Sequence, residues 1–168
     1  LFEMPVSFDV DLAELTLRYR GLQKAVHPDK FANNSEQEKL LAVQRAAQVN
    51  EGYAILKTPL ARAKYLLSIN DVLSDDNATL SDPGFLMQQM EMRESLEAAN
   101  RQTDAFAAVE NVLDEIDEAH RELLDEIKQR FNSTSPDYPL INECVLKLNF
   151  YNRLKGEAEN LLAKIENE

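Results

Sequence analysis

The chain has little of what several protein classes require. Its 168 residues include one cysteine, four glycines and six prolines. A single thiol, Cys144, forms neither an internal disulfide nor a thiolate cluster, and it fits a reducing compartment. Few glycines and prolines argue against an all-β protein, which needs many turns. Leu, Ala, Glu, Gln and Lys are abundant instead, and these residues favour helices.

Long apolar segments and positive charge are also scarce. No apolar run approaches the roughly 20 residues that a transmembrane helix needs. Acidic residues interrupt the first positions, which is unlike a signal peptide. The formal net charge is −12 at pH 7. Because binders of nucleic acids and of anionic membranes present a broad basic surface, we expect neither ligand here.

Residues 1–70 carry the pattern of a helical hairpin. Asp11 with Glu14 is a capping pair that predicts the start of a first helix. Ser35 with Glu38 predicts the start of a second helix in the same way. Each helix has apolar residues spaced for one buried face, namely Leu12, Leu15, Tyr19, Leu22 and Val26, then Ala42, Ala46, Val49, Tyr53 and Leu56. The loop between them is short, so we expect antiparallel packing, with a short third helix after "KTP".

The rest of the chain predicts a separate bundle. Asp, Asn, Ser, Pro and Gly crowd together after the hairpin, which is typical of a linker, placed at residues 71–82. Three amphipathic patterns follow, over residues 83–101, 104–131 and 138–166. They predict a three-helix bundle over residues 83–168. The predicted fold class is therefore all-α, with two domains.

A histidine, a proline and an aspartate follow the first helix in "AVHPDKFANN". Pro28 cannot continue a helix and moves His27 out of the helical region. A helix stop followed by a turn explains this tripeptide as well as a functional site does. The other histidine, His120, falls in an apolar stripe, where we expect it in the core. No nucleophile with a nearby base and no glycine-rich phosphate loop is present, so we expect no metal, cofactor or enzymatic activity.

The surroundings of the tripeptide favour a contact surface. At about 100° per residue, Arg20, Lys24 and His27 fall on one flank of the first helix, outside its apolar stripe. Solvation is the usual explanation of surface charge, but this flank contrasts in sign with a net charge of −12. It leads into a proline-stiffened loop that carries Asp29. This combination suits a preorganised surface for a partner.

The first helix, "HPDK" and the second helix resemble a J-domain, the module with which J-type co-chaperones engage DnaK-like ATPase chaperones. The stretch "NEGYAILKTPLARAKYL" strengthens the resemblance. In the second half, "FLMQQMEMRESLE" and "KLNFYNRLKGEAENL" resemble the C-terminal bundle of the HscB family, co-chaperones of bacterial iron–sulfur cluster assembly. The resemblance implies two domains that form an L, with the J-domain over residues 1–70.

The resemblance also implies partners. HscB proteins bring the cluster scaffold IscU to the chaperone HscA and stimulate its ATPase, which promotes cluster transfer and iron–sulfur protein maturation. Carried onto this chain, the residues that contact the chaperone are His27, Pro28, Asp29, Arg20, Lys24 and Lys30. Asp29 should accept a charge-assisted hydrogen bond, and the basic residues should dock on an acidic surface.

The helix expected from residue 83 has apolar residues on two faces. Phe85, Met92, Leu96 and Ala99 form a core face, and Met87 and Met90 point nearly opposite to it. On the last helix, Phe150 points away from the core stripe, which contains Cys144 as a packing residue. The second apolar face is either buried against the first domain or exposed as a protein-binding patch. In the family this face binds the scaffold, and the matching residues are Leu86, Met87, Met90, Glu91, Glu94 and Phe150.

Three classes of function remain open. We favour a co-chaperone adaptor with two separate sites, expected to be a monomer in the cytoplasm. Within this class, the chain could instead serve a general DnaK-like chaperone with another client. The second class is a passive client-binding adaptor, and the third is an enzyme. The intact "HPD" argues against a passive adaptor. An enzyme has no convergent set of catalytic residues to support it.

Overall fold

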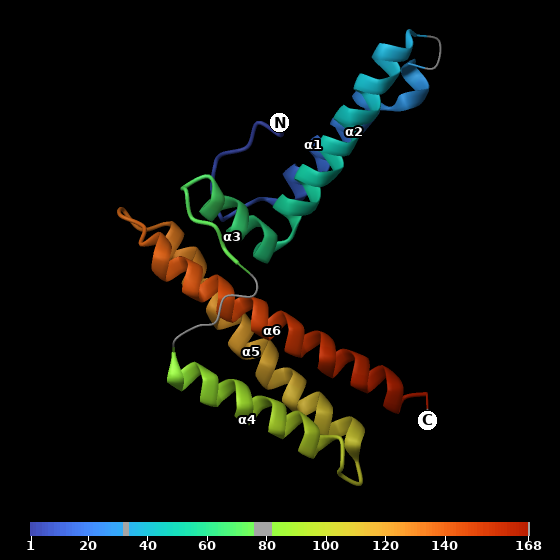
Figure 1. The fold of residues 1–168 in the computed structure, drawn as a ribbon. Coiled ribbons are helices and arrows are strands. Elements are labelled where there is room, and N and C mark those ends of the chain that lie inside the picture. The colour runs from blue at the N-terminus through green and yellow to red at the C-terminus, as the bar shows by residue number, and fades with distance from the viewer. Residues whose placement is uncertain (32–33, 76–81, 168) are drawn as a thin grey trace. The chain divides into compact units, whose positions relative to one another are not determined.

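The computed structural model describes residues 1–31, 34–75 and 82–167. Within these ranges every regular element is helical, so the all-α prediction is confirmed. The elements are α1 (Leu12–Val26), the 3₁₀ turn η1 (Pro28–Phe31), α2 (Glu36–Lys57), α3 (Pro59–Ser68), α4 (Pro83–Ala99), α5 (Ala105–Phe131) and α6 (Tyr138–Ile165), shown in Figure 1. Two compact units, Leu1–Asn70 and Asp71–Glu168, divide the chain. The predicted linker over 71–82 includes residues 76–81, which lie outside the described residues, and the L shape stays a prediction.

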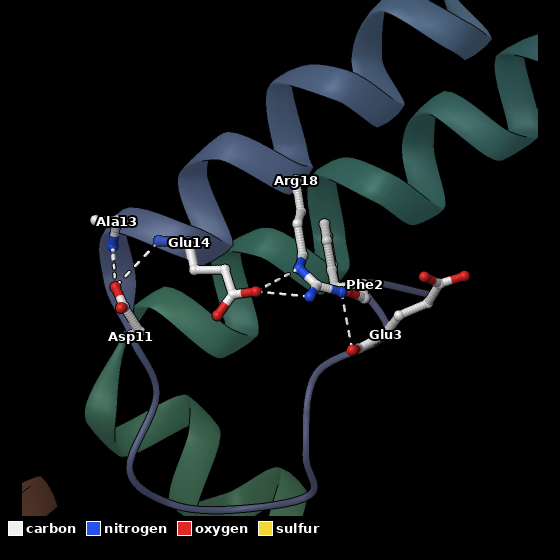
Figure 2. Close-up of polar contacts among 6 residues, drawn as sticks. All are labelled: Phe2, Glu3, Asp11, Ala13, Glu14 and Arg18. Atoms are coloured by element: carbon white, nitrogen blue, oxygen red, sulfur yellow. Dashed lines mark hydrogen bonds and ion pairs between the residues drawn. The ribbon is translucent and has the colours of Figure 1, made fainter.

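Side-chain caps determine where α1 and α2 begin. Asp11 Oδ1 accepts hydrogen bonds from two backbone N–H groups of the first turn of α1, at 2.8 and 3.0 Å (Figure 2). Ser35 and Glu38 form the expected reciprocal capping box at the start of α2. The predicted pair at α1 is only half formed. The Glu14 carboxylate binds Arg18 at 2.6 Å instead, one helical turn further on.

Arg18 ties the segment before α1 to that helix. Its Nη1 donates to the carbonyl oxygens of Phe2 at 2.7 Å and Glu3 at 2.8 Å, while Nε and Nη2 bind Glu14 (Figure 2). Glu3 has a φ of 53°, in the left-handed region, which costs a non-glycine residue on the order of 1 kcal/mol. Two carbonyl groups converge on one guanidinium here, and their hydrogen bonds stabilise this backbone turn.

The core of the first unit lies between α1, α2 and the N-terminal segment. The two helices lie side by side and antiparallel, as predicted (Figure 1). Leu15, Val49 and Phe2 are the buried centre of this core. Around them pack the partly buried residues Met4, Val10, Tyr19, Leu22, Val26, Tyr53 and Leu56. Leu12, predicted in the buried stripe, is half exposed because it lies in the first turn of α1, ahead of this centre.

Gly52 of α2 lies against the N-terminal segment. A Cβ atom there would be 3.0 Å from Cε2 of Phe2 and 3.2 Å from Cδ2 of Leu1. Distances this short would force the neighbouring side chains to move. Glycine therefore permits the close approach of the segment to α2, although it costs about 0.5–1 kcal/mol relative to alanine inside a helix.

The second unit is built on α5 and α6, which lie side by side along most of their length (Figure 1). Their buried residues include Val109, Ile116, Leu123, Ile127, Ile141, Cys144, Val145 and Leu148. Two interactions of Asp82 hold the start of α4 in place. Its carboxylate accepts a hydrogen bond from the N–H of Phe85 at 3.1 Å, and it forms an ion pair with Lys147 of α6 at 2.9 Å. The hydrogen bond from Lys147 lowers the pKa of Asp82.

His120 was predicted in the bundle core, and this prediction is wrong. The side chain is partly exposed, and its Nε2 lies 2.9 Å from Oδ1 of Asn152 on α6. The buried stripe of α5 runs through Ile116 and Leu123 on either side of this position, and His120 lies at the margin of that stripe. A polar partner across that edge satisfies the imidazole without burial.

The core of the first unit generates a stability prediction. Leu15→Ala should lower the free energy of unfolding by about 2–5 kcal/mol, because the fully buried side chain leaves a cavity. The matched control is Leu17→Ala on the same helix, where the side chain is 72% exposed and the change should stay within about 0.5 kcal/mol. Urea denaturation followed by circular dichroism measures both. Equal losses would contradict the assignment of the buried face.

Candidate functional site

The sequence His27-Pro28-Asp29, called the HPD turn below, connects α1 to α2. The α1 helix ends at Val26, and His27 is extended with φ −60° and ψ 128°. A residue before proline is restricted to this extended region, which explains why the helix stops there. Pro28 then opens η1, in which the Lys30 N–H donates to the His27 carbonyl at 3.0 Å. The predicted helix stop and turn are confirmed.

The side chains of His27 and Asp29 are turned to solvent. Their exposed fractions are 56% and 91%. The Asp29 N–H donates to Nδ1 of His27 at 3.3 Å, and that same nitrogen lies 3.5 Å from the Asp29 carboxylate. Asp29 therefore presents an exposed carboxylate acceptor on a short loop that Pro28 restricts.

A cavity of about 800 Å³ opens beside the HPD turn, between α1 and α2. Its lining residues are Arg20, Gln23, Lys24, Val26, His27, Lys30, Ala46 and Asn50. Four of the predicted residues, Arg20, Lys24, His27 and Lys30, thus share one surface. Asp29 is not among the lining residues, and nothing is described of the Pro28 side chain. The sequence analysis placed Ala46 in the buried stripe of α2, whereas it is partly exposed and lines the cavity. Asn50, one turn further along α2, was missed as a lining residue.

Charge is divided unequally between the two units. Residues 1–70 contain 8 acidic and 9 basic residues, whereas residues 71–168 contain 22 acidic and 9 basic residues. The first unit is therefore close to neutral, and three of its cations, Arg20, Lys24 and Lys30, line the cavity. The net negative charge of the chain comes from the second unit.

A second candidate surface lies on α4. The side chains of Leu86, Met87 and Met90, called the methionine patch below, are 41%, 63% and 63% exposed. Glu91 and Glu94 are exposed beside them. The opposite side of the helix buries Phe85, Leu96 and Ala99. Of the two alternatives that the sequence left open for this face, the structure has the three apolar side chains exposed. A patch of adaptable methionines rimmed by carboxylates is suited to binding a protein.

Phe150 was predicted to be part of this exposed patch, and that prediction is wrong. Its side chain is 7% exposed. It packs edge-on against Phe85 and Tyr151, with both ring centroids at 5.5 Å. The prediction assumed a single buried stripe on α6. In the structure α6 meets α5 on one side and α4 on another, so a residue far from the first stripe is covered by the second contact.

Two cations lie over the aromatic contact between α4 and α6. Lys147 Nζ lies 5.2 Å from the centroid of Phe85, and the Arg93 guanidinium lies 5.9 Å from that of Phe150. Arg93 also lies 3.8 Å from Glu157 of α6. Cation–π contacts of this kind contribute roughly 0.5–1 kcal/mol at exposed sites. Arg93 therefore helps to cover Phe150 and borders the methionine patch, a role that the sequence did not indicate.

The described residues offer little for metal or redox chemistry. Among them there is no group of three or more His, Cys, Asp or Glu side chains arranged to hold a metal ion. Cys144 is buried, and burial raises the pKa of its thiol, which disfavours the reactive thiolate. In the same part of the chain no helix is long and apolar enough to cross a membrane.

Known proteins resemble this chain over nearly its whole length. A family described as HSCB C-terminal oligomerisation domain matches residues 81–159. The chain is 45% identical over 159 residues to the Co-chaperone protein HscB homolog of Shewanella baltica (strain OS195), covering 94% of this chain and 91% of the relative. It is 45% identical over 168 residues to the homolog of Shewanella frigidimarina, covering 99% and 94%.

Two solved structures share the fold. Chaperone HscB from Vibrio cholerae matches with a TM-score of 0.86 and 36% identity, covering 97% of this chain and 95% of that one. The crystal structure of human co-chaperone protein HscB matches with a TM-score of 0.87 and 29% identity, covering 99% of this chain and 81% of that one.

The two sides of α4 generate a prediction that separates core from surface. Phe150→Ala should lower the free energy of unfolding by about 3–5 kcal/mol, because it empties the aromatic contact under α4. Met90→Ala, the matched control on the exposed side, should change it by no more than about 0.5 kcal/mol. Thermal and urea unfolding measure the difference. A Phe150→Ala protein as stable as the wild type would show that the ring is not part of the core.

Proposed function

The chain belongs to the HscB family of co-chaperones, and from that premise we propose that it recruits the iron–sulfur scaffold protein IscU to the DnaK-like chaperone HscA. In this role it stimulates the ATPase of the chaperone and aids the transfer of clusters to acceptor proteins. It acts as a cytoplasmic monomer, and the strong negative charge of its second unit opposes self-association. The ATP is bound and hydrolysed by the chaperone.

The observation that carries the proposal is the solvated HPD turn beside a cavity lined by cations. We call the HPD turn with Arg20, Lys24 and Lys30 the docking surface. Its basic residues attract an acidic face of the chaperone and speed association. The Asp29 carboxylate, 91% exposed, is available for a charge-assisted hydrogen bond to a cationic side chain of the chaperone. Because proline and η1 already restrict the loop, little ordering is needed on binding.

Stimulation of the ATPase is an allosteric act. A co-chaperone shifts its partner toward the hydrolysis-competent state only if it binds that state more tightly than the other. The docking surface supplies a rigid pair of helices and a short loop for this discrimination. No residue of this chain needs to enter the catalytic site of the chaperone.

The methionine patch is the proposed scaffold site, with Glu91 and Glu94 as its rim. Its unbranched side chains adapt to the shape of a partner, and burial of three large apolar groups supplies the affinity. The excess of acidic residues in the second unit favours a scaffold with a basic face. Phe150 supports α4 from beneath and is not proposed as a contact residue.

The proposed function predicts that Asp29→Asn abolishes stimulation of HscA. A charge-assisted hydrogen bond contributes about 1.5–3 kcal/mol, and this one is made in the stimulated state. Steady-state ATPase assays with HscA measure the effect, with Glu51→Gln as a matched control that removes an exposed charge on α2. The helical content and the affinity for IscU should not change. Wild-type stimulation by the Asp29→Asn protein would contradict the assignment.

For the second unit we predict the opposite result: a substitution that weakens IscU binding but leaves stimulation of HscA unchanged. Replacing Met87 and Met90 with Ala should weaken IscU binding by about 2 kcal/mol or more, the cost of losing a binding hot spot. Stimulation of HscA without the scaffold should stay at the wild-type level. Leu73→Ala, an 86% exposed side chain of the same unit, is the control in isothermal titration calorimetry. If the double variant binds IscU as well as this control does, the patch is not the scaffold site.

A further inference from the structure

Asn50 of α2 binds two side chains of α1 at once. Its Oδ1 accepts a hydrogen bond from the Tyr19 hydroxyl at 3.1 Å and another from Nε2 of Gln23 at 3.3 Å. Nε2 of Gln23 also donates to the Tyr19 hydroxyl. The three side chains therefore form a closed hydrogen-bond triangle, in which Asn50 is the member that α2 contributes.

The triangle continues a series of contacts that runs along the two helices. The Tyr19 ring stacks on Tyr53 of α2, with centroids 4.0 Å apart and planes inclined by 12°. Tyr53 in turn has its hydroxyl 3.2 Å from Oγ1 of Thr16. Stacking holds the helices together, but hydrogen bonds weaken steeply when their angle changes. The triangle thus defines the register of α1 against α2 more sharply than the stacked rings do.

The triangle also forms part of the cavity wall. Gln23 and Asn50 both line the cavity. Arg20 directly follows Tyr19 in the sequence, and Lys24 directly follows Gln23, so each cation of α1 adjoins a member of the triangle. A rotation or slide of α1 that breaks the triangle therefore displaces both cations and the start of the HPD turn relative to α2.

We propose that Asn50 is a positioning residue of the docking surface. It holds α1 in the register in which Arg20, Lys24 and the HPD turn face the chaperone together. The inference rests on the proposed function, because it concerns the affinity of the same surface. Without Asn50 the packed core still holds the two helices together, but the end of α1 samples orientations in which its cations do not face the chaperone, and the apparent affinity falls by the fraction of molecules that is competent to bind.

The stability of the hairpin does not depend on this triangle. Gln23 and Asn50 are exposed, so water replaces their hydrogen bonds at little net cost when one partner is removed. Leu15, Val49 and the stacked tyrosines remain in place. A loss of chaperone affinity with only a small loss of stability, far below that of a core substitution, is therefore the expected signature of Asn50.

The experiment measures ATPase stimulation of HscA as a function of co-chaperone concentration. Asn50→Ala should raise the concentration for half-maximal stimulation by about two- to tenfold, the range set by one or two neutral hydrogen bonds. The maximal stimulation should stay near the wild-type value, because the HPD turn is intact once bound. Tyr19→Phe, which keeps the stacked ring, should give a similar increase, and the two changes should not add. Tyr53→Phe is the matched control, since it removes a hydroxyl of the same stack outside the triangle.

The outcomes separate this inference from the proposed function. If the wild-type protein does not stimulate HscA, the proposed function fails. If it does, and Asn50→Ala has the wild-type half-maximal concentration, the positioning role alone is overturned. A drop in melting temperature of Asn50→Ala as large as that of Leu15→Ala would also overturn it, because it would show general loss of the hairpin core, as would an equal effect of Tyr53→Phe on the half-maximal concentration. Non-additive losses of affinity in the Asn50 and Tyr19 variants, with at most a small drop in melting temperature, would support it.

Discussion

The packing of α1 against α2 around Leu15 and Val49 is the constraint on which the docking surface depends. Arg20, Lys24, His27, Asp29 and Lys30, which are proposed to meet the chaperone, are exposed, so they add little to the stability of the fold. The two helices hold both ends of the HPD turn and bring the walls of the cavity together. Arg18 of α1 holds the N-terminal segment against the two helices by donating hydrogen bonds to two backbone carbonyl oxygens of that segment. A stable apolar interior thus allows a small polar loop to keep its shape.

In the second unit, one side of α4 contributes to the stability of the fold and the other side is the surface proposed to bind the scaffold. One side of α4 packs Phe85 against the aromatic residues of α6, and the other side leaves Met87 and Met90 in solvent. A partner that binds the exposed side therefore need not disturb the core. The unequal division of charge adds a second distinction, because the near-neutral unit and the acidic unit attract different partners at long range.

Local signals in the sequence predicted the helices well, since prolines and capping residues act over a few positions. The HPD turn followed from the proline, and the second apolar face with the methionines followed from the helical spacing of the residues around them. Phe150 was misplaced because a helical wheel does not say how many neighbours a helix has. Glu14 was predicted to cap the start of α1, but its carboxylate pairs with Arg18, one turn further along the helix. Asn50 was missed because its partners lie on another helix, at a register that only the packed hairpin defines.

The contact between Gly52 and Phe2 has an evolutionary consequence. A side chain at position 52 needs either a smaller residue at position 2 or a displaced N-terminal segment. Displacement would strain the hydrogen bonds from Arg18 to that segment. Neither position can change freely while the other stays the same. Homologous chains that have lost the glycine should therefore also have lost the phenylalanine, so that the two positions co-vary although they are far apart in the sequence.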